Sequence, residues 1–432
     1  MKYFIAITLS VVFFAKFATA KTYSLEEILQ LSKQNSPILA YSTAKIERVS
    51  AEVKLISAAY FPILNIDETF SRSTNPVNVF AMKLNQQQFT MNDFAIDKLN
   101  EPDSRDNYQT SINVYLPLDI SGEIGLTKKS AERMKEASTH EMKWRQKEVQ
   151  KNIYTLFYAY KHLGEMKIFL EKELDYLKKF IAQYDSKNKD NKNRYLSYNQ
   201  ARILKENVEE GIEILVIEKK NINNQMIFIS GIADLIVDET APVSLTKELE
   251  KWKNAPDKPL NRDDLQAMQS QLQAADFWIK KEKRSLLPRL GIFTDYQIHS
   301  FDLNDYANNY TVGAKLTWSF GASTPAKIAL ATTQKRELES MHDQTQKKVQ
   351  TDHQELIADL NKIEMSINRA ENKHKLYQEN KEILTFQYKR GSIDLYNLLE
   401  NFAMYIDNFS KLQKIKTDYQ SKLIQLANDY TY

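Results

Sequence analysis

The residue types that usually carry catalysis are sparse and scattered in this sequence of 432 residues. Cysteine is absent, which removes disulfides, thiolate metal sites and cysteine nucleophiles. The nine glycines form neither a phosphate-binding loop nor a nucleophile elbow. No pair among the six histidines has the i, i+4 spacing of a helical metal site; they are His140, His162, His299, His342, His353 and His374. We therefore expect no catalytic residues, no metal and no cofactor, and we predict that the protein is not an enzyme.

Charge narrows the possible partners in the same way. Charged residues make up 27% of the chain, but the formal net charge is only +3. Nucleic-acid binding requires a basic field, so we expect no nucleic-acid partner. Acidic pairs are frequent in the segments with helical spacing. There they indicate solvated helix faces, and nothing in the sequence suggests a buried carboxylate.

The first twenty residues read as a secretory signal peptide. Lys2 gives a positive start, residues 5–14 are mostly apolar, and Ala18-Thr19-Ala20 supplies the small residues that a signal peptidase recognises. A membrane anchor helix is the alternative, but the apolar run is too short and Lys16 interrupts its end. We predict cleavage before Lys21, with no lipid anchor because no cysteine follows.

Four segments alternate between apolar and polar residues with the period of a β-strand. In one of them Val114 and Leu116 point one way while Ser111 and Asn113 point the other. About ten residues of such alternation is the weak signature of a membrane strand with a lipid face and a wet face. The pattern predicts strands at about 62–72, 109–119, 289–299 and 310–320, with residues 73–107 as a long exposed loop.

Some residues of these strands have two possible readings. Four aromatic residues near the strand ends either form belts at the membrane interface or reflect ordinary strand propensity: Tyr108, Tyr310, Trp318 and Phe320. Glu68 lies on the apolar side of its strand without an explanation, unless it sits near an interface, where the cost of a charge falls.

The rest of the chain has helical spacing. Ser24 caps a first helix that runs to about residue 60 with a bend near Pro37, and a heptad pattern in the next long helix predicts packing against a parallel neighbour. No segment after the signal is apolar enough to cross a bilayer as a helix. We expect further helices at about 127–184, 194–229, 261–287, 325–389 and 396–428, with tips at 185–193 and Gly391.

The order helix, strand, loop, strand, long helix, tip, helix occurs twice. We assign the repeats to about 22–232 and 261–429, joined by an irregular crossover at about 233–260. Four strands cannot close a membrane barrel, because every backbone group in lipid must be paired and the smallest single-chain barrels have eight strands. Copies must therefore pool their strands by cyclic symmetry. Three copies give twelve strands, although symmetry alone does not select three. The fold class is mostly α with a small membrane β-barrel.

Several motifs in this order resemble the TolC family of outer-membrane efflux and secretion channels. They span the chain from Thr22 to Asp429 and are Ser57-Ala58-Ala59-Tyr60-Phe61-Pro62, Leu116-Pro117-Leu118 before Gly122, Ser285-Leu286-Leu287-Pro288, and Tyr388-Lys389-Arg390-Gly391 before Leu398-Leu399. The resemblance implies a homotrimer with a twelve-strand barrel in the lipid of the outer membrane of a Gram-negative bacterium and a helical tunnel in the periplasm.

The same resemblance implies a function and partners. The trimer would be the passive exit duct of a tripartite efflux pump or a type I secretion system. Its partners would be a periplasmic adaptor (a membrane fusion protein) and an inner-membrane transporter. The alternative is a soluble periplasmic coiled-coil adaptor or scaffold, which shares the helices but does not need the four strands.

The resemblance also implies a periplasmic gate at the second tip. The family pattern places two acids on successive helical turns after the tip glycine, and counting from Gly391 puts Asn397 and Glu400 there, so the charge is kept only at Glu400. Asp394 either adds to the gate or caps the return helix.

The tip turns are the expected adaptor-docking sites, carried by Gly391, Tyr388 and Asn191. The first tip departs from the family pattern because it has no glycine, and Asn191 is expected to take the left-handed conformation instead.

Overall fold

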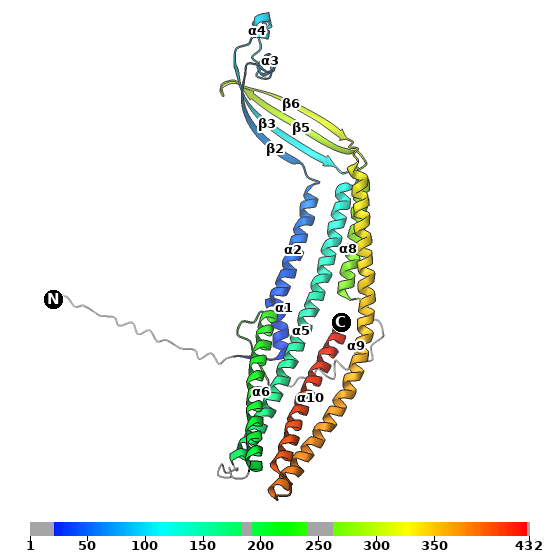
Figure 1. The fold of residues 1–432 in the computed structure, drawn as a ribbon. Helices are drawn as coiled ribbons and strands as arrows, with labels where there is room; N and C mark the ends of the chain where they lie inside the picture. The colour runs from blue at the N-terminus through cyan, green and yellow to red at the C-terminus, as the bar shows by residue number, and fades with distance from the viewer. Residues whose placement is uncertain (1–20, 183–191, 240–261, 430–432) are drawn as a thin grey trace, which may run out of the picture. The chain divides into compact units, whose positions relative to one another are not determined.

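The computed structural model of the protein describes residues 21–182, 192–239 and 262–429 (Figure 1). The predicted signal peptide, the first tip and most of the crossover lie outside these residues. The chain divides into two compact units, and each draws on both halves of the sequence. The first unit comprises residues 1–42, 142–262 and 348–432, and the second comprises residues 43–141 and 263–347.

The second unit contains an antiparallel sheet of four strands in the order β2-β3-β5-β6 (Figure 1). The strands are β2 (Ile63–Ser73), β3 (Arg105–Leu118), β5 (Arg289–Ser300) and β6 (Tyr306–Thr317). All four lie where the alternation predicts them, but β3 and β6 begin four residues earlier than expected. The strand β6 also ends before Trp318, because Thr317 is already paired with Arg289, the first residue of β5.

The register gives this sheet one apolar face and one polar face. Ile66, Ile112, Tyr296 and Tyr310 form one row across the four strands, and directly opposite residues point to the same side. The adjacent row, which points to the other side, consists of Asn65, Asn113, Asp295 and Thr311. The sheet therefore has the two-sided pattern that the sequence predicts.

Both edges of the sheet, β2 and β6, lack a partner strand among the residues that the structure describes. Tyr310 lies in the middle of β6, opposite Tyr296, so its predicted place near a strand end is wrong. Trp318 follows β6, and its indole nitrogen donates to the carbonyl of Leu286 at 2.9 Å. Glu68 accepts a hydrogen bond from Thr110, which lies directly opposite it on β3. The next pair of opposite residues on the same apolar face, towards the end of β2, is Phe70 and Tyr108, whose rings are in contact.

The segment expected to be a loop of residues 73–107 is largely structured. It contains α3 (Pro76–Asn85), a 3-10 turn η1 (Met91–Phe94) and α4 (Ile96–Asn100). The sequence signals are local: the Asn75 side chain accepts from two amides at the start of α3, and Pro76 occupies the first helical position. The rings of Phe80, Phe89 and Phe94 pack edge to face. Gln86, at the end of α3, donates to the carbonyl of Asp106 at 2.8 Å and to Asn107 Oδ1 at 3.0 Å, so this small subdomain contacts the end of the sheet directly.

The first helical segment is two helices, α1 (Leu25–Asn35) and α2 (Pro37–Ala58). Ser24 and Glu27 form a reciprocal capping box at the start of α1. Ser36 is extended, with ψ 123°, because a residue before proline is pushed out of the helical region. The predicted bend near Pro37 is therefore a complete break.

The longer helices are α5 (Glu123–Ala182), α6 (Lys192–Ser230), α8 (Asp263–Arg284), α9 (Ser323–Lys389) and α10 (Leu395–Asp429). Within the first unit, Ile153, Leu170 and Leu177 of the predicted heptad are buried. The helix α9 runs parallel to α5, since Phe169 contacts His374 and Tyr176 bonds to Thr385. Among the described helices, none is long and apolar enough to cross a bilayer.

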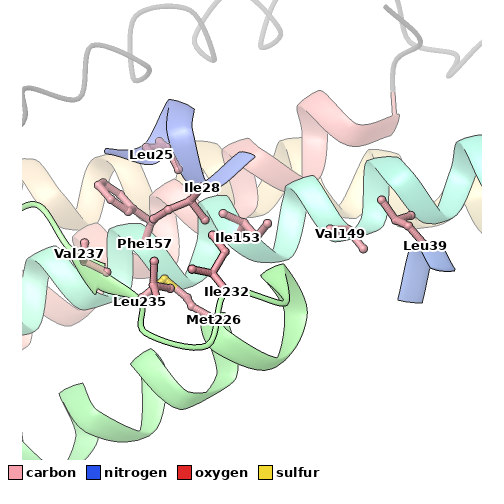
Figure 2. Packing of buried hydrophobic residues seen from close by; sticks show 10 residues of the cluster. All are labelled: Leu25, Ile28, Leu39, Val149, Ile153, Phe157, Met226, Ile232, Leu235 and Val237. Carbon is pink, nitrogen blue, oxygen red and sulfur yellow. The ribbon is translucent and has the colours of Figure 1, made fainter. Parts of the chain in front are cut away.

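A compact core ties the N-terminal segment to the helices of the first unit, as Figure 2 shows. Thr22–Tyr23 (β1) pairs in parallel with Ile236–Val237 (β4), so the predicted irregular crossover is wrong at its described start. Gly231 makes the turn from α6 into β4 with φ +73°, and a Cβ there would lie 2.0 Å from the carbonyl oxygen of Asn35. The buried members of this core are Leu25, Ile28, Leu39, Val149, Ile153, Phe157, Met226, Ile232, Leu235 and Val237.

Candidate functional site

The second tip is a tight turn between α9 and α10, and Gly391 makes it possible. Gly391 has φ +72°, a left-handed conformation that costs glycine little. Its amide donates to the carbonyl of Tyr388 at 2.9 Å, and the Ser392 amide donates to the carbonyl of Gln387 at 3.0 Å. These two bonds form a Schellman motif, which satisfies the last carbonyls of α9. The residues that predict a tip therefore do form one.

Asp394 caps the return helix. Its Oδ1 accepts a hydrogen bond from the amide of Asn397 at 3.2 Å, and α10 begins at the next residue, Leu395. A carboxylate at this position satisfies an amide with no partner inside the helix and faces the positive end of the helix dipole. Of the two roles open for Asp394, capping is therefore present in the structure.

Two faces of α10 differ sharply in character. On one face Leu395, Leu398, Leu399 and Phe402 are buried in a core with α5, α6 and α9. On the other face a stripe at helical spacing is exposed, consisting of Asp394, Asn397, Glu400, Met404, Asp407, Lys411, Lys414 and Asp418. The structure thus places the three predicted gate residues together on one exposed face, while the apolar face fixes the rotation of the helix.

Glu400 has no ion-pair partner among the residues that the structure describes. Asp407, two turns further along, contrasts with it because its carboxylate pairs with Lys411 at 2.5 Å. The basic residues at the tip precede Gly391, and the guanidinium group of Arg390 lies 4.2 Å from the centre of the Phe386 ring. No residue that the structure describes therefore neutralises the charge of Glu400.

The predicted docking residues are not equivalent. Tyr388 is partly buried, and its ring centre lies 5.2 Å from that of Phe180 on α5. It therefore joins the tip of the second hairpin to α5. Gly391 is exposed at the turn itself. Asn191 lies outside the described residues.

Sequence reasoning missed a buried ion pair above this tip. Glu173 of α5 is 2% exposed and pairs with Lys381 of α9, so the expectation of no buried carboxylate is wrong. A signal for it exists, because Glu173 stands three residues after Leu170 and four before Leu177 and so lies on the heptad seam. Its partner could not be identified without the packing of α9 against α5.

No group of acids and histidines in the described residues could hold a metal ion. His162 has several polar contacts, and its ring nitrogens lie 2.9 Å from Gln413 Oε1 and 2.8 Å from Gln420 Oε1. Burial lowers the pKa of His162, but its contacts to Glu165, Gln420 and Gln413 outweigh this and raise the pKa above its usual value. These contacts link α5 to α10 and suggest no catalytic arrangement.

The chain is similar to known channel proteins. Residues 28–211 match the family model described as outer membrane efflux protein. The fold matches a membrane protein from Pseudomonas aeruginosa with a TM-score of 0.78 at 15% identity, over 94% of this chain and 92% of that one. The chain has the TolC-type fold. The predicted resemblance and the mostly helical fold class are thereby confirmed.

Two further structures of this TolC-type fold are outer membrane channels. The CmeC channel of Campylobacter jejuni has a TM-score of 0.77 at 14% identity and matches over 94% of this chain and 85% of its own. The open-state MtrE channel of Neisseria gonorrhoeae has a TM-score of 0.76 at 12% identity, over 94% and 88%. No curated protein sequence matches the chain. The family match and the shared TolC-type fold support an outer-membrane efflux channel over the soluble adaptor.

Proposed function

We propose that this chain is the subunit of a passive homotrimeric channel in the outer membrane. It would serve as the exit duct of a tripartite efflux pump or a type I secretion system. The match to outer membrane efflux proteins and the TolC-type fold support the channel class and its location. Efflux and protein secretion both fit this architecture.

The observation that carries the proposal is the sheet with one apolar face and two open edges. Val312 and Leu316 on edge strand β6 and Leu64 and Ile66 on edge strand β2 are all more than half exposed. An open edge in lipid leaves amides and carbonyls unpaired, at a cost of several kcal/mol for each group. Pairing β6 of one copy with β2 of the next closes the sheet, and repeating that contact around an axis gives a ring. Three copies supply the twelve strands of the proposed barrel.

The periplasmic end of the proposed tunnel is gated at the second tip, with Glu400 as its main charged residue. Three copies would bring three Glu400 carboxylates towards one axis, with Asn397 one turn nearer the tip. Rings of carboxylates in a narrow pore attract cations and hinder anions. Asp394 serves first as the helix cap, and its charge adds to the same end of the pore.

The periplasmic adaptor would dock at the second tip, at Gly391 and Tyr388. An inner-membrane transporter would deliver the cargo. The proposed channel would be passive, in keeping with the match to outer membrane efflux proteins. No metal-binding group occurs in the described residues, and no catalytic motif occurs in the sequence.

Conductance of the purified protein in a planar lipid bilayer tests the proposal. Discrete current steps, together with a trimer band in an unheated gel that becomes monomeric on heating, are the expected result. A soluble coiled-coil adaptor would yield neither, and it would be released from cells without detergent.

A further inference from the structure

We propose that the polar face of the sheet carries a binding site for amphiphilic organic cations, made by Tyr115 and Phe293 with Asp295 beside them. The inference rests on the proposed channel, in which this face lines the lumen of the barrel. It goes further by naming a class of cargo and the residues that contact it.

The site begins with one row of the polar face that is not polar. Ile63, Tyr115, Phe293 and Gly313 are directly opposite one another across the four strands. The next two rows of that face, counting away from the helices, hold mostly amides, hydroxyls and acids, including Asn113 and Gln297. A row with two aromatic rings therefore borders the wet part of this face, and the next row towards the helices holds Pro117, Gly291 and Lys315.

Two glycines let the aromatic rings lie close to the sheet. A Cβ on Gly291 would lie 2.3 Å from the Tyr115 hydroxyl oxygen and 2.5 Å from two carbons of its ring, and a Cβ on Gly313 would lie 2.7 Å from the Phe293 ring. Both positions must therefore stay without a side chain if the rings keep their places. Each ring covers the backbone of the neighbouring strand and presents its other surface towards the lumen.

Covering a glycine with an aromatic ring also stabilises strand pairing, which is a purely structural reason for such contacts. That reason applies equally on either face of the sheet. It does not explain why both rings stand on the wet face, where Tyr115 is still 37% exposed. An apolar surface left open inside a water-filled passage is suited to the apolar body of a passing molecule.

The charges beside the row select the sign of that molecule. Asp295 follows Phe293 by two residues on the same face of β5, about 7 Å away along the strand. Its Oδ2 accepts from Gln297 at 2.6 Å, and no described residue forms an ion pair with it. Asp67 stands one row further on, on β2. Aromatic faces attract cations as well, so the rings and the acids favour the same charge.

Two basic residues of this face, Lys315 and Arg289, need to be weighed. Lys315 lies on β6 opposite Gly291, and four residues along the strand separate it from Thr311, the residue opposite Asp295. That separation is about 14 Å. It exceeds the Debye length of about 8 Å at physiological salt, so Lys315 acts weakly on a cation held beside Asp295. Lys315 is, however, next to Gly291, over which the Tyr115 ring lies, so the charge of the molecule is expected at the Asp295 end of the row. Arg289, two residues before Gly291 on β5, also interacts electrostatically with the Tyr115 hydroxyl, but its charge is paired with Glu123 at 2.9 Å.

Block of potassium current through the purified trimer tests the site with three probes. Tetraphenylphosphonium has an aromatic body and a positive charge, tetraphenylborate has the same shape with a negative charge, and tetramethylammonium has the charge without the rings. We expect tetraphenylphosphonium to block at about tenfold lower concentration than either of the others. Equal potency of the three probes on the wild-type channel would overturn the inference without any variant.

Variants then locate the site. Tyr115→Leu combined with Phe293→Leu keeps apolar bulk but removes the rings, and Asp295→Asn removes the charge; each should weaken block by tetraphenylphosphonium severalfold. Tyr296→Leu removes a ring from the opposite face of β5 and is the matched control, with unchanged block expected. Equal losses in the control and the double variant would place the effect elsewhere. If the double variant does not assemble, Asp295→Asn and the three-probe comparison decide.

The outcomes separate the inference from the channel proposal. Current through the wild-type trimer without preference for tetraphenylphosphonium removes only the inference. Absence of any current removes the channel, and the inference with it.

Discussion

Lys381 of α9 forms an ion pair with Glu173 of α5, which is buried to 2% exposure. The ammonium group also lies 4.6, 4.7 and 5.0 Å from the ring centres of Tyr176, Phe402 and Tyr405. Burial, with the nearby Glu173 charge, raises the pKa of Tyr405 to about 12. The pair fixes the second hairpin against α5 above the proposed gate.

Lys381→Met should destabilise the protein by about 3–5 kcal/mol, because it leaves the Glu173 carboxylate buried without a partner. Heat dissociation of the trimer and the midpoint of chemical unfolding measure the loss. Adding Glu173→Gln to the same chain should recover much of it, since no charge then remains buried. Lys411→Met is the control, because its pair with Asp407 is exposed on both sides and is worth at most about 1 kcal/mol. Equal losses in the two lysine variants would contradict the assigned role.

The raised pKa of His162 predicts that the stability of the folded protein depends on pH. Its pKa in the folded chain is raised above its usual value, so the folded state holds the proton more tightly than the unfolded chain. The resulting stability is complete below the unfolded pKa of about 6.5 and is lost as the pH rises through the folded pKa. The charge of Glu165, on the same helix, favours the protonated form of His162. A cavity of about 570 Å³ beside His162 is also lined by Glu218 and Asp418, whose charges favour the proton, and by Lys411 and Lys414, whose charges disfavour it.

The measurement is the unfolding midpoint of wild type and His162→Gln between pH 5.5 and 8. The wild type should lose stability relative to the variant as the pH rises across this range. Parallel curves for the two proteins would mean that His162 does not titrate between α5 and α10.

Arginine on the apolar face of the sheet should block membrane insertion. Val114 lies opposite Leu64 and Thr294, and Leu316 lies opposite Leu290. Val114→Arg and Leu316→Arg should each cost about 2–4 kcal/mol if the site is near the bilayer midplane. The yield of heat-modifiable trimer in outer-membrane fractions reports the effect. Asn113→Arg, one residue away on the polar face, should assemble far better; normal assembly of both lipid-face variants would refute the assigned face.

Local sequence signals foretold much of this fold because the interactions behind them are local. The capping box of Ser24 and Glu27, the Gly391 turn and the alternation through Val114 all depend on residues a few positions apart. Asn397 and Glu400 also lie on one exposed face of α10, as their spacing of three residues predicts, whereas their role at a gate is implied by the family resemblance alone. None of these features needed knowledge of a distant contact.

What the sequence did not predict depends on residues far apart in the chain. Lys381 looks like any other lysine of a charged helix until α9 packs against α5 and brings it to Glu173. The pairing of Thr22–Tyr23 with Ile236–Val237 involves strands of two residues, too short for any period. The polar composition of residues 73–107 obscured α3, whose start is nevertheless marked by Asn75 and Pro76.

The segment from Ser73 to Asn107 should face the outside of the cell. Strands that begin and end on long periplasmic helices leave this connection on the far side of the membrane. Gln87 and Asp97 are both exposed, but Gln87 has φ +54°, so cysteine is better placed at Asp97. Since the chain has no native cysteine, an impermeant maleimide should label Asp97→Cys on intact cells. Cysteine at Glu213 on α6 is the control and should react only after the outer membrane is opened; the reverse pattern would invert the topology.

The last prediction concerns Glu400, whose exposed carboxylate has no ion-pair partner among the described residues. In a trimer three such groups would face the pore axis, and a ring of carboxylates favours cations over anions. Glu400→Gln should therefore lower the potassium-to-chloride permeability ratio severalfold and weaken block by divalent cations. Asn397→Asp, which adds the acid that the family pattern has one turn earlier, should change both in the opposite direction.

Two controls separate the gate from a general effect of charge. Asp394→Asn keeps a good helix cap while removing one charge. It therefore measures how much the charge of Asp394 contributes to ion selectivity without loss of the turn. Glu213→Gln makes the same charge change on an exposed position of α6 in the first hairpin and should leave selectivity unchanged. If Glu400→Gln and Glu213→Gln behave alike in reversal-potential measurements, Glu400 does not line the narrow part of the pore. A loss of selectivity that is largest in Glu400→Gln, smaller in Asp394→Asn and absent in Glu213→Gln, with a gain in Asn397→Asp, is the result that the exposed face of α10 predicts.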